Sequence, residues 1–263
     1  METSPPLRRL TIAVDAESYS SRNQHGQLQL QRDLLAILHQ ACENGDLNRL
    51  EWDRQQQGDG ELAILPPGTV EDRTISDFVG ELDKALYHHN KMLNHEYRVR
   101  LRVAVHQGNI RIGDNGFVGK AVVAVCRMRD NDQVRRVLAG HPKSDLVLVV
   151  SESIYSDVIE EGTHALYRWR FDPIVIDEPA KDFRANAWIY VPDSASQPES
   201  FLDPDAVPAD ESGGSERGRS QDGPPGGRDR QGAPVTVHGD VTAKGGDVAF
   251  GNQYGDKRTY NRF

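Results

Sequence analysis

Over residues 10–191, the sequence alternates between short apolar runs of strand length and longer amphipathic runs of helical spacing. A strand pattern at residues 10–14 comes first, and apolar side chains then recur three and four residues apart in the segment 30–41. There follow two strand patterns, a second helix, the alternating run 99–106, a third helix, the buried-type run 145–150 and a closing pair of strands. This order predicts an α+β fold, in which one sheet carries helices packed on one face.

Two aspartates stand where strands of this pattern meet a turn. Asp15 ends the first strand, and Asp59 lies in a Gly-Asp-Gly turn between the strand patterns 50–54 and 61–65. Two carboxylates at neighbouring strand edges can hold divalent cations against a triphosphate, because Mg²⁺ takes one or two protein carboxylates and completes its octahedron with water and phosphate oxygens. The alternative interpretation is that both are ordinary turn residues.

The overall composition excludes several classes of protein. The net charge of −9 argues against non-specific binding to nucleic acid or to an anionic membrane surface. Cys42 and Cys126 are too few for a disulfide framework, which favours a reducing compartment. The first six residues do not form a signal peptide, and no apolar run approaches the length of a membrane span. We therefore expect a cytoplasmic protein.

The composition also divides the chain into four segments. Residues 1–9 form an N-terminal tail, and residues 10–192 form the patterned domain. Residues 193–234 are rich in Pro, Gly and charges of both signs and almost free of aliphatic side chains, so they cannot bury enough apolar surface to offset their ordering entropy. They are expected to be a disordered linker. Residues 235–263 regain an alternating apolar pattern broken by glycines, which predicts a short β-prone motif.

Four pieces of the domain, in order, resemble the catalytic domain of class III nucleotidyl cyclases, and the resemblance covers most of residues 10–191. It implies a ferredoxin-like, palm-type cyclase sheet. The pieces are the strand end Ala13-Val14-Asp15, the hairpin Gly58-Asp59-Gly60-Glu61-Leu62-Ala63, the strand and loop from Leu101 to Gly108, and the helix start from Gly116 to Arg127.

The resemblance also implies roles for particular residues. Asp15 and Asp59 would bind two ions of Mg²⁺ or Mn²⁺, which lower the pKa of the ribose 3′-hydroxyl and neutralise the phosphates. Arg127 would stabilise the charge that grows on the α-phosphate, although it could equally be a surface arginine of its helix. Gly58 belongs to the turn that faces the substrate.

Three substrate-facing positions depart from the family pattern. Gln55 stands where the family usually has a base-reading lysine, and Gly116 stands where adenylyl cyclases usually have an acidic residue. Val123 replaces the asparagine that orients the ribose, and its side chain offers no hydrogen bond. The two residues that usually recognise adenine would both be missing. Either other groups recognise a different base, or the site no longer catalyses the reaction.

The C-terminal segment resembles a second kind of motif. Its short apolar strands, glycines and Asn/Gln side chains are similar to bacterial amyloid signalling motifs of the RHIM type, which tether an effector to an NLR-like sensor. The match spans roughly residues 235–255. A disordered glycine-rich tail, or a β-hairpin that docks on the domain, is the alternative.

Two hypotheses for function remain open. In the first, a homodimeric cyclase-like enzyme makes a cyclic nucleotide from an NTP when its tail clusters it. In the second, the domain keeps the fold as a nucleotide-binding or scaffold module, and the tail acts as a homotypic adaptor. Gln55 and Val123 favour the second hypothesis, and the aspartate pair favours the first.

Overall fold

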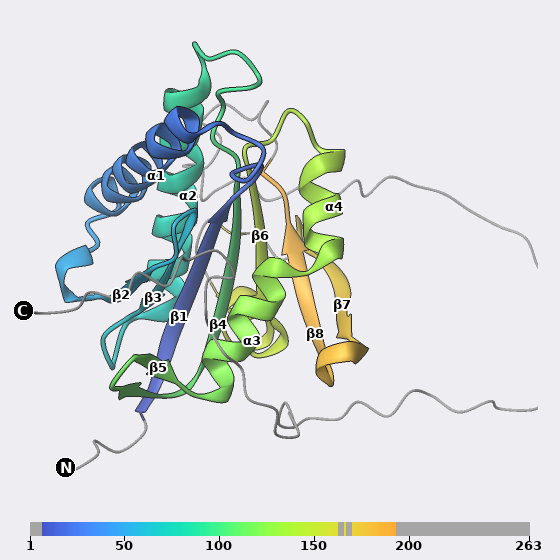
Figure 1. Cartoon of the computed structure of the whole chain (residues 1–263). Coiled ribbons are helices and arrows are strands. Elements are labelled where there is room, and N and C mark those ends of the chain that lie inside the picture. The colour runs from blue at the N-terminus through green and yellow to red at the C-terminus, as the bar shows by residue number, and fades with distance from the viewer. Residues whose placement is uncertain (1–6, 163–165, 167–169, 193–263) are drawn as a thin grey trace, which may run out of the picture.

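The computed structural model describes residues 7–162, 166 and 170–192 (Figure 1). Its strands are β1 (Leu7–Ala16), β2 (Asp53–Gln56), β3 (Gly60–Ile64), β4 (Leu101–Gly113), β5 (Gly116–Val118), β6 (Leu146–Ser151), β7 (Asp172–Glu178) and β8 (Phe183–Tyr190). Its helices are α1 (Gln24–Asn44), α2 (Glu71–Asn90), α3 (Lys120–Asp130), α4 (Asp132–Gly140) and the single turn α5 (Glu152–Ile154), with the short helical turns η1 (Arg49–Glu51), η2 (Tyr155–Ile159) and η4 (Pro179–Lys181).

Within these residues, one sheet of eight strands runs in the order β2-β3-β1-β4-β6-β8-β7, and β5 pairs with β4 off this order. Neighbouring strands are antiparallel except β4 and β6, which are parallel. The predicted hairpin around Asp59 is present as β2 and β3. The mostly antiparallel sheet with its helices confirms the predicted α+β class.

One detail of that prediction is wrong, because the helices cover both faces of the sheet rather than one (Figure 1). Side chains of a strand alternate between faces. Leu10 and Ile12 of β1 therefore pack beneath α1 and α2, whereas Ala13 packs on the opposite side with α3 and α4. The central strands are buried on both faces, which explains why β6 is a continuous apolar run.

The third predicted helix is in fact two helices, α3 and α4. Asn131 separates them with extended backbone angles, φ −62° and ψ 138°. Its side chain accepts a hydrogen bond from the backbone N–H of Gln133 and so caps the start of α4. The break turns α4 away from α3, so that the two helices cover different parts of one face.

The predicted linker (193–234) and the predicted C-terminal motif (235–263) lie outside the described residues, as does most of the N-terminal tail. Among the residues that are described, no helix is both long enough and apolar enough to cross a membrane.

Candidate functional site

The structure brings the two predicted aspartates together at the end of β1. Asp15 pairs in register with Gly60 of β3, and the N–H of the next residue, Ala16, donates a 2.8 Å hydrogen bond to the carbonyl oxygen of Asp59. Asp15 is buried, with 7% of its surface exposed, whereas Asp59 is half-buried. The turn therefore holds the carboxylate of Asp59 close to that of Asp15 on the neighbouring strand, as the sequence predicts.

Glycine makes this close approach possible. A Cβ atom on Gly60 would lie 2.3 Å from the carbonyl oxygen of Val14, a distance that real side chains do not tolerate. Gly58 has a φ of +81°, in the left-handed region that glycine adopts at no steric cost. The Gly-Asp-Gly sequence thus fits the turn on backbone grounds alone, and it fixes where Asp59 stands.

Two arginines flank Asp15. Arg102, opposite it on β4, forms an ion pair with its carboxylate. Arg129 of α3 is close enough for its charge to act on the same group. Burial raises the pKa of Asp15 above its ordinary value, the charges of Arg102 and Arg129 oppose that rise, and the nearby Asp59 adds to it.

Arg129 ties α3 to the Gly-Asp turn. One of its terminal nitrogens donates a 2.6 Å hydrogen bond to the side-chain oxygen of Gln57, and its Nε and Nη2 form a bidentate pair with Asp130 at 2.9 and 3.0 Å. Burial by itself would lower the pKa of Arg129, but the hydrogen bonds and charge of Asp130, with a smaller contribution from Asp15, raise it above its ordinary value. Arg129 therefore stays charged.

The donor set does not fit a two-metal centre as it stands. No group of three or more His, Cys, Asp or Glu side chains within the described residues could hold a metal ion. Mg²⁺ needs only one or two carboxylates, so Asp59 can contribute to one ion. Arg102 engages one carboxylate oxygen of Asp15, so a cation that bridges both aspartates must use the other oxygen, beside the charge of Arg102, or displace the arginine.

The structure does not place Arg127 beside the aspartates of its own chain. Arg127 and Arg129 are two residues apart on α3, about 200° around the helix, so they face different neighbours. The guanidinium of Arg127 lies over the ring of Phe183 in β8, 5.0 Å from its centroid, and its Nη1 is buried without a hydrogen-bond partner among the described residues. Val123, one turn earlier, is half-buried.

Gln55 and Gly116, the two predicted base-facing positions, are brought together. A Cβ on Gly116 would lie 2.8 Å from the side-chain oxygen of Gln55, so the amide of β2 covers the start of β5. A larger residue at position 116, which also has a φ of +107°, would displace this amide. The absence of a side chain there is thus what admits Gln55.

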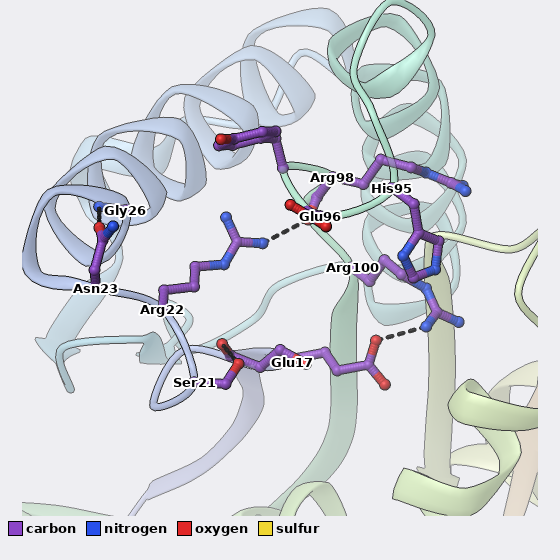
Figure 2. A pocket seen from close by; sticks show the side chains of 11 residues that line it. Glu17, Ser21, Arg22, Asn23, Gly26, His95, Glu96, Arg98 and Arg100 are labelled. Atoms are coloured by element: carbon purple, nitrogen blue, oxygen red, sulfur yellow. Dashed lines mark hydrogen bonds and ion pairs between the residues drawn. The ribbon is translucent and has the colours of Figure 1, made fainter.

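A pocket of about 390 Å³ opens at the same end of β1 (Figure 2). It lies between the loop after β1, the start of α1 and the loop before β4, and its lining includes Glu17, Ser21, Arg22, His95, Arg98 and Arg100. Arg22 reaches across it to donate a 2.7 Å hydrogen bond to the carbonyl oxygen of Arg98, and the Nε of Arg22 is buried with no partner in the described part of the chain. The pocket adjoins the aspartate pair, because Glu17, which lines it, is two residues after Asp15 in the chain.

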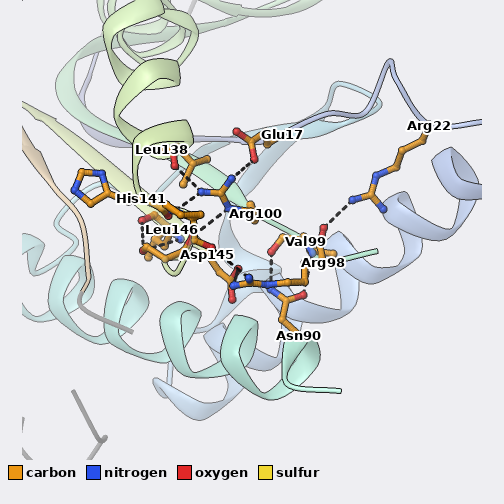
Figure 3. Close-up of polar contacts among 12 residues, drawn as sticks. Glu17, Arg22, Asn90, Arg98, Val99, Arg100, Leu138, His141, Asp145 and Leu146 are labelled. Atoms are coloured by element: carbon orange, nitrogen blue, oxygen red, sulfur yellow. Dashed lines mark hydrogen bonds and ion pairs between the residues drawn. The ribbon is translucent and has the colours of Figure 1, made fainter. Parts of the chain in front are cut away.

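Arg100 closes the floor of this pocket and is fully engaged (Figure 3). Its guanidinium pairs with Glu17 at 2.5 Å and donates to the carbonyl oxygens of Leu138, His141 and Ser144. Arg102 of β4 thus pairs with Asp15 of β1, and Arg100, the residue before β4, pairs with Glu17, the residue after β1. The two pairs neutralise the acidic end of β1 from within the chain.

Neither Arg102 nor Arg129 was predicted from the sequence to belong to the site. Both are buried, at 7% exposure. A signal for Arg129 was available, because it continues the apolar stripe of α3 through Val122 and Cys126 at spacings of four and three residues. A charged residue in a buried stripe is rarely without a specific partner.

Solved structures of nucleotidyl cyclases share this fold. The guanylyl cyclase Cya2 superimposes with a TM-score of 0.51 and 11% identity, over 73% of this chain and 96% of its own. The catalytic core of a rhodopsin-guanylyl cyclase with converted specificity, in complex with ATPαS, gives 0.49 and 13% over 73% and 99%. The adenylate/guanylate cyclase/hydrolase from Silicibacter pomeroyi gives 0.48 and 18% over 72% and 99%.

The described domain has the fold of a class III nucleotidyl cyclase catalytic domain. At these identities the likeness concerns the fold alone. Comparison of the sequence with family models and with curated proteins finds no match.

Proposed function

We propose that this chain is a divergent nucleotidyl cyclase-like domain, which binds a nucleoside triphosphate beside Asp15 and Asp59, at the end of β1, and forms a cyclic nucleotide from it. One observation carries the proposal: Asp15 at the end of β1 and Asp59 in the turn before β3 lie close together in a cyclase fold. The arginine-lined pocket beside them supports it, because the Nε of Arg22 is buried without a partner among the described residues and a guanidinium can bind phosphate.

In the proposed reaction, the ribose 3′-hydroxyl gives its proton to water and its oxygen forms a bond to the α-phosphorus. The bond from that phosphorus to the oxygen that bridges the α- and β-phosphates breaks, and pyrophosphate leaves. The residues of this chain bind and orient the substrate. The amide of Gln55 carries both donors and an acceptor, so it can pair with the edges of several bases. A base choice other than that of the usual adenylyl cyclases follows from the absence of a charged reader at positions 55 and 116.

The proposed active form is a homodimer. Within one chain, Arg127 points toward β8, away from the aspartates, so it can stabilise the α-phosphate only at the aspartate pair of a second chain. It must also leave the ring of Phe183 to do so. The loss of the contact with Phe183 costs free energy, so catalysis would depend on how tightly the second chain binds.

A binding module without turnover is the second candidate. Val123 offers no hydrogen bond to a ribose, and Asp15 is already neutralised by Arg102. Both features are expected to impair catalysis more than they impair the binding of a triphosphate. In that case the domain would be a nucleotide-responsive scaffold.

Incubation of the full chain with each NTP and Mn²⁺ or Mg²⁺, followed by chromatography of the products, separates the candidates. The cyclase proposal predicts a cyclic product from at least one NTP, abolished by Asp59→Asn and retained by Asp46→Asn, whose side chain is 95% exposed. If no NTP yields a product, even at high protein concentration, the enzyme proposal fails and the binding module remains.

We further propose that residues 235–263 cluster the domain and connect it to an NLR-like sensor in a signalling or defence pathway. The support is the sequence pattern of that segment. A synthetic peptide of these residues is expected to form fibres that bind thioflavin, while a peptide with its valines replaced by serine does not. If the native peptide forms no fibres, the signalling role of the tail is excluded without affecting the nucleotide site.

A further inference from the structure

Arg129 is a buried cation within the candidate nucleotide site. It stands on α3, is 7% exposed, and reaches the Gly-Asp turn through Gln57 at 2.6 Å. The same nitrogen lies 3.5 Å from the carbonyl oxygen of Val14, the residue before Asp15. The guanidinium is therefore held at the junction of β1 and the β2–β3 turn, where the two aspartates meet.

The contacts of Arg129 show that its contribution is a fixed charge. A guanidinium has five N–H groups. Its Nε and Nη2 bind Asp130, and its Nη1 binds Gln57 and approaches Val14. Few of its donors remain for a ligand, but its charge acts on Asp15 through a protein interior in which screening by water is weak. It is thus a positioning residue that sets the local field.

This field opposes the binding of metal ions at Asp15. The charged groups around the site are the carboxylates of Asp15, Asp59 and Asp130 and the guanidiniums of Arg102 and Arg129. Asp130 is matched by Arg129 and Asp15 by Arg102, which leaves Asp59 as the carboxylate without a matching cation in this set. Three carboxylates against two guanidiniums leave a net charge of −1, so this set cannot offset a second divalent ion, which would also lie near both guanidiniums.

We propose that Arg129 takes the place of one of the two divalent cations, so that a nucleoside triphosphate binds with at most one metal ion per chain. This inference rests on the proposed function for the identity of the ligand. Its consequence for metal binding does not, because the repulsion of a cation by Arg129 is present without nucleotide. The two can therefore fail separately.

The test is titration of Mn²⁺ into the full chain, followed by the electron paramagnetic resonance signal of free Mn²⁺, with and without a non-cyclisable triphosphate analogue. Wild type is expected to bind at most one Mn²⁺ per chain. In Arg129→Gln, Mn²⁺ alone is expected to bind at least roughly tenfold more tightly, because a repulsive charge is removed. Arg129→Lys, which keeps the charge, and Arg136→Gln, at an exposed position of α4, are expected to match wild type.

Two Mn²⁺ ions on the wild-type chain with the analogue bound would overturn the inference, whatever the stability of the variants. So would unchanged Mn²⁺ affinity in a folded Arg129→Gln protein, checked by its melting temperature. If the analogue does not bind at all, the proposed function fails, and the arm with Mn²⁺ alone still decides the role of Arg129.

Discussion

At the scale of single residues, a buried ion pair stands next to the turn that carries Asp59. Arg49 of η1 and Glu61 of β3 form a bidentate pair at 2.7 and 2.8 Å, and both side chains are buried. Glu61 directly follows Gly60, so this pair anchors β3 next to the turn that carries Asp59. Removal of one member leaves the other charged and buried without compensation.

We expect Glu61→Ala to lower the free energy of unfolding by about 3 kcal/mol, because Arg49 is then desolvated and unpaired. Urea denaturation measures this change. The matched control is Lys84→Ala, which removes the more exposed pair with Glu81 and should cost less than about 1 kcal/mol. Equal losses in the two variants would show that the buried pair has no special role.

Asp83 of α2 makes stability depend on pH. Burial, with the nearby charge of Asp145, raises its pKa from 3.8 to about 6, against a smaller opposing effect of Lys84. Because the folded state holds the proton more tightly than the unfolded state, this group stabilises the fold below about pH 4 and loses that contribution as pH rises to about 6.

Asp83→Asn is therefore expected to stabilise the protein by about 1–2 kcal/mol at pH 7 and to have little effect at pH 4. Denaturation curves at the two pH values measure the difference, and Asp46→Asn provides the exposed control. A variant that is less stable than wild type at pH 7 would show that the Asp83 carboxylate is favourably bound.

At the scale of elements, the turn at Gly60 and the helix α2 give opposite expectations for the same substitution. A methyl group at Gly60 would collide with the backbone of Val14, whereas a Cβ on Gly80 of α2 meets nothing within 4 Å. Backbone cannot move away as a flexible side chain can. The candidate site thus lies next to position 60, where β1 and β3 approach too closely for any side chain.

We expect Gly60→Ala to destabilise the protein by more than about 2 kcal/mol and to weaken triphosphate binding, since the turn that carries Asp59 must shift. Gly80→Ala is expected to stabilise it by about 0.5–1 kcal/mol through helix propensity. Thermal denaturation of both variants measures the contrast. A neutral Gly60→Ala would mean that β1 and β3 are not so closely apposed.

The elements were predicted well where one local pattern decides them. The hairpin, the amphipathic helices and the order of strands follow from periodicity and glycine placement. The division of the third helix at Asn131 was missed, because the apolar pattern continues across it. The placement of helices on both faces was also missed, since it depends on where a helix docks rather than on its sequence.

The candidate site divides in the same way. The nearness of Asp15 to Asp59 was anticipated, and the family resemblance named Gln55 and Gly116 as base-reading positions without predicting their contact. Arg102 was not anticipated, because an arginine that pairs across a sheet carries no local signature, whereas Arg129 could have been found from its place in the buried stripe of α3. Their discovery changes the expected chemistry from a two-metal site to one that is largely neutralised from within the chain.

At the scale of the whole molecule, the separation of Arg127 from the aspartates of its own chain makes the proposed activity a property of a dimer. Two inactive variants should then complement one another. Arg127→Ala supplies intact aspartates, and Asp59→Asn supplies an intact arginine, so a mixed dimer contains one complete site.

We expect each variant alone to form no product, and an equal mixture to recover roughly a quarter of the wild-type rate, because half of the dimers are mixed and each has one of two sites intact. Product formation at constant total protein measures it. If a mixture shown to exchange subunits recovers no activity, the dimer proposal is wrong. Arg127 then either acts with the aspartates of its own chain or takes no part in the reaction.

The central claim is that the site at Asp15 and Asp59 binds a nucleoside triphosphate. Titration calorimetry tests this claim most directly. Each NTP is titrated, in excess Mg²⁺, into wild type, Asp59→Asn and the exposed control Asp46→Asn. The account predicts saturable binding of at least one NTP, weakened by roughly tenfold or more in Asp59→Asn and unchanged in Asp46→Asn. Binding that Asp59→Asn leaves intact, or no binding of any NTP to the folded wild-type chain, would contradict it.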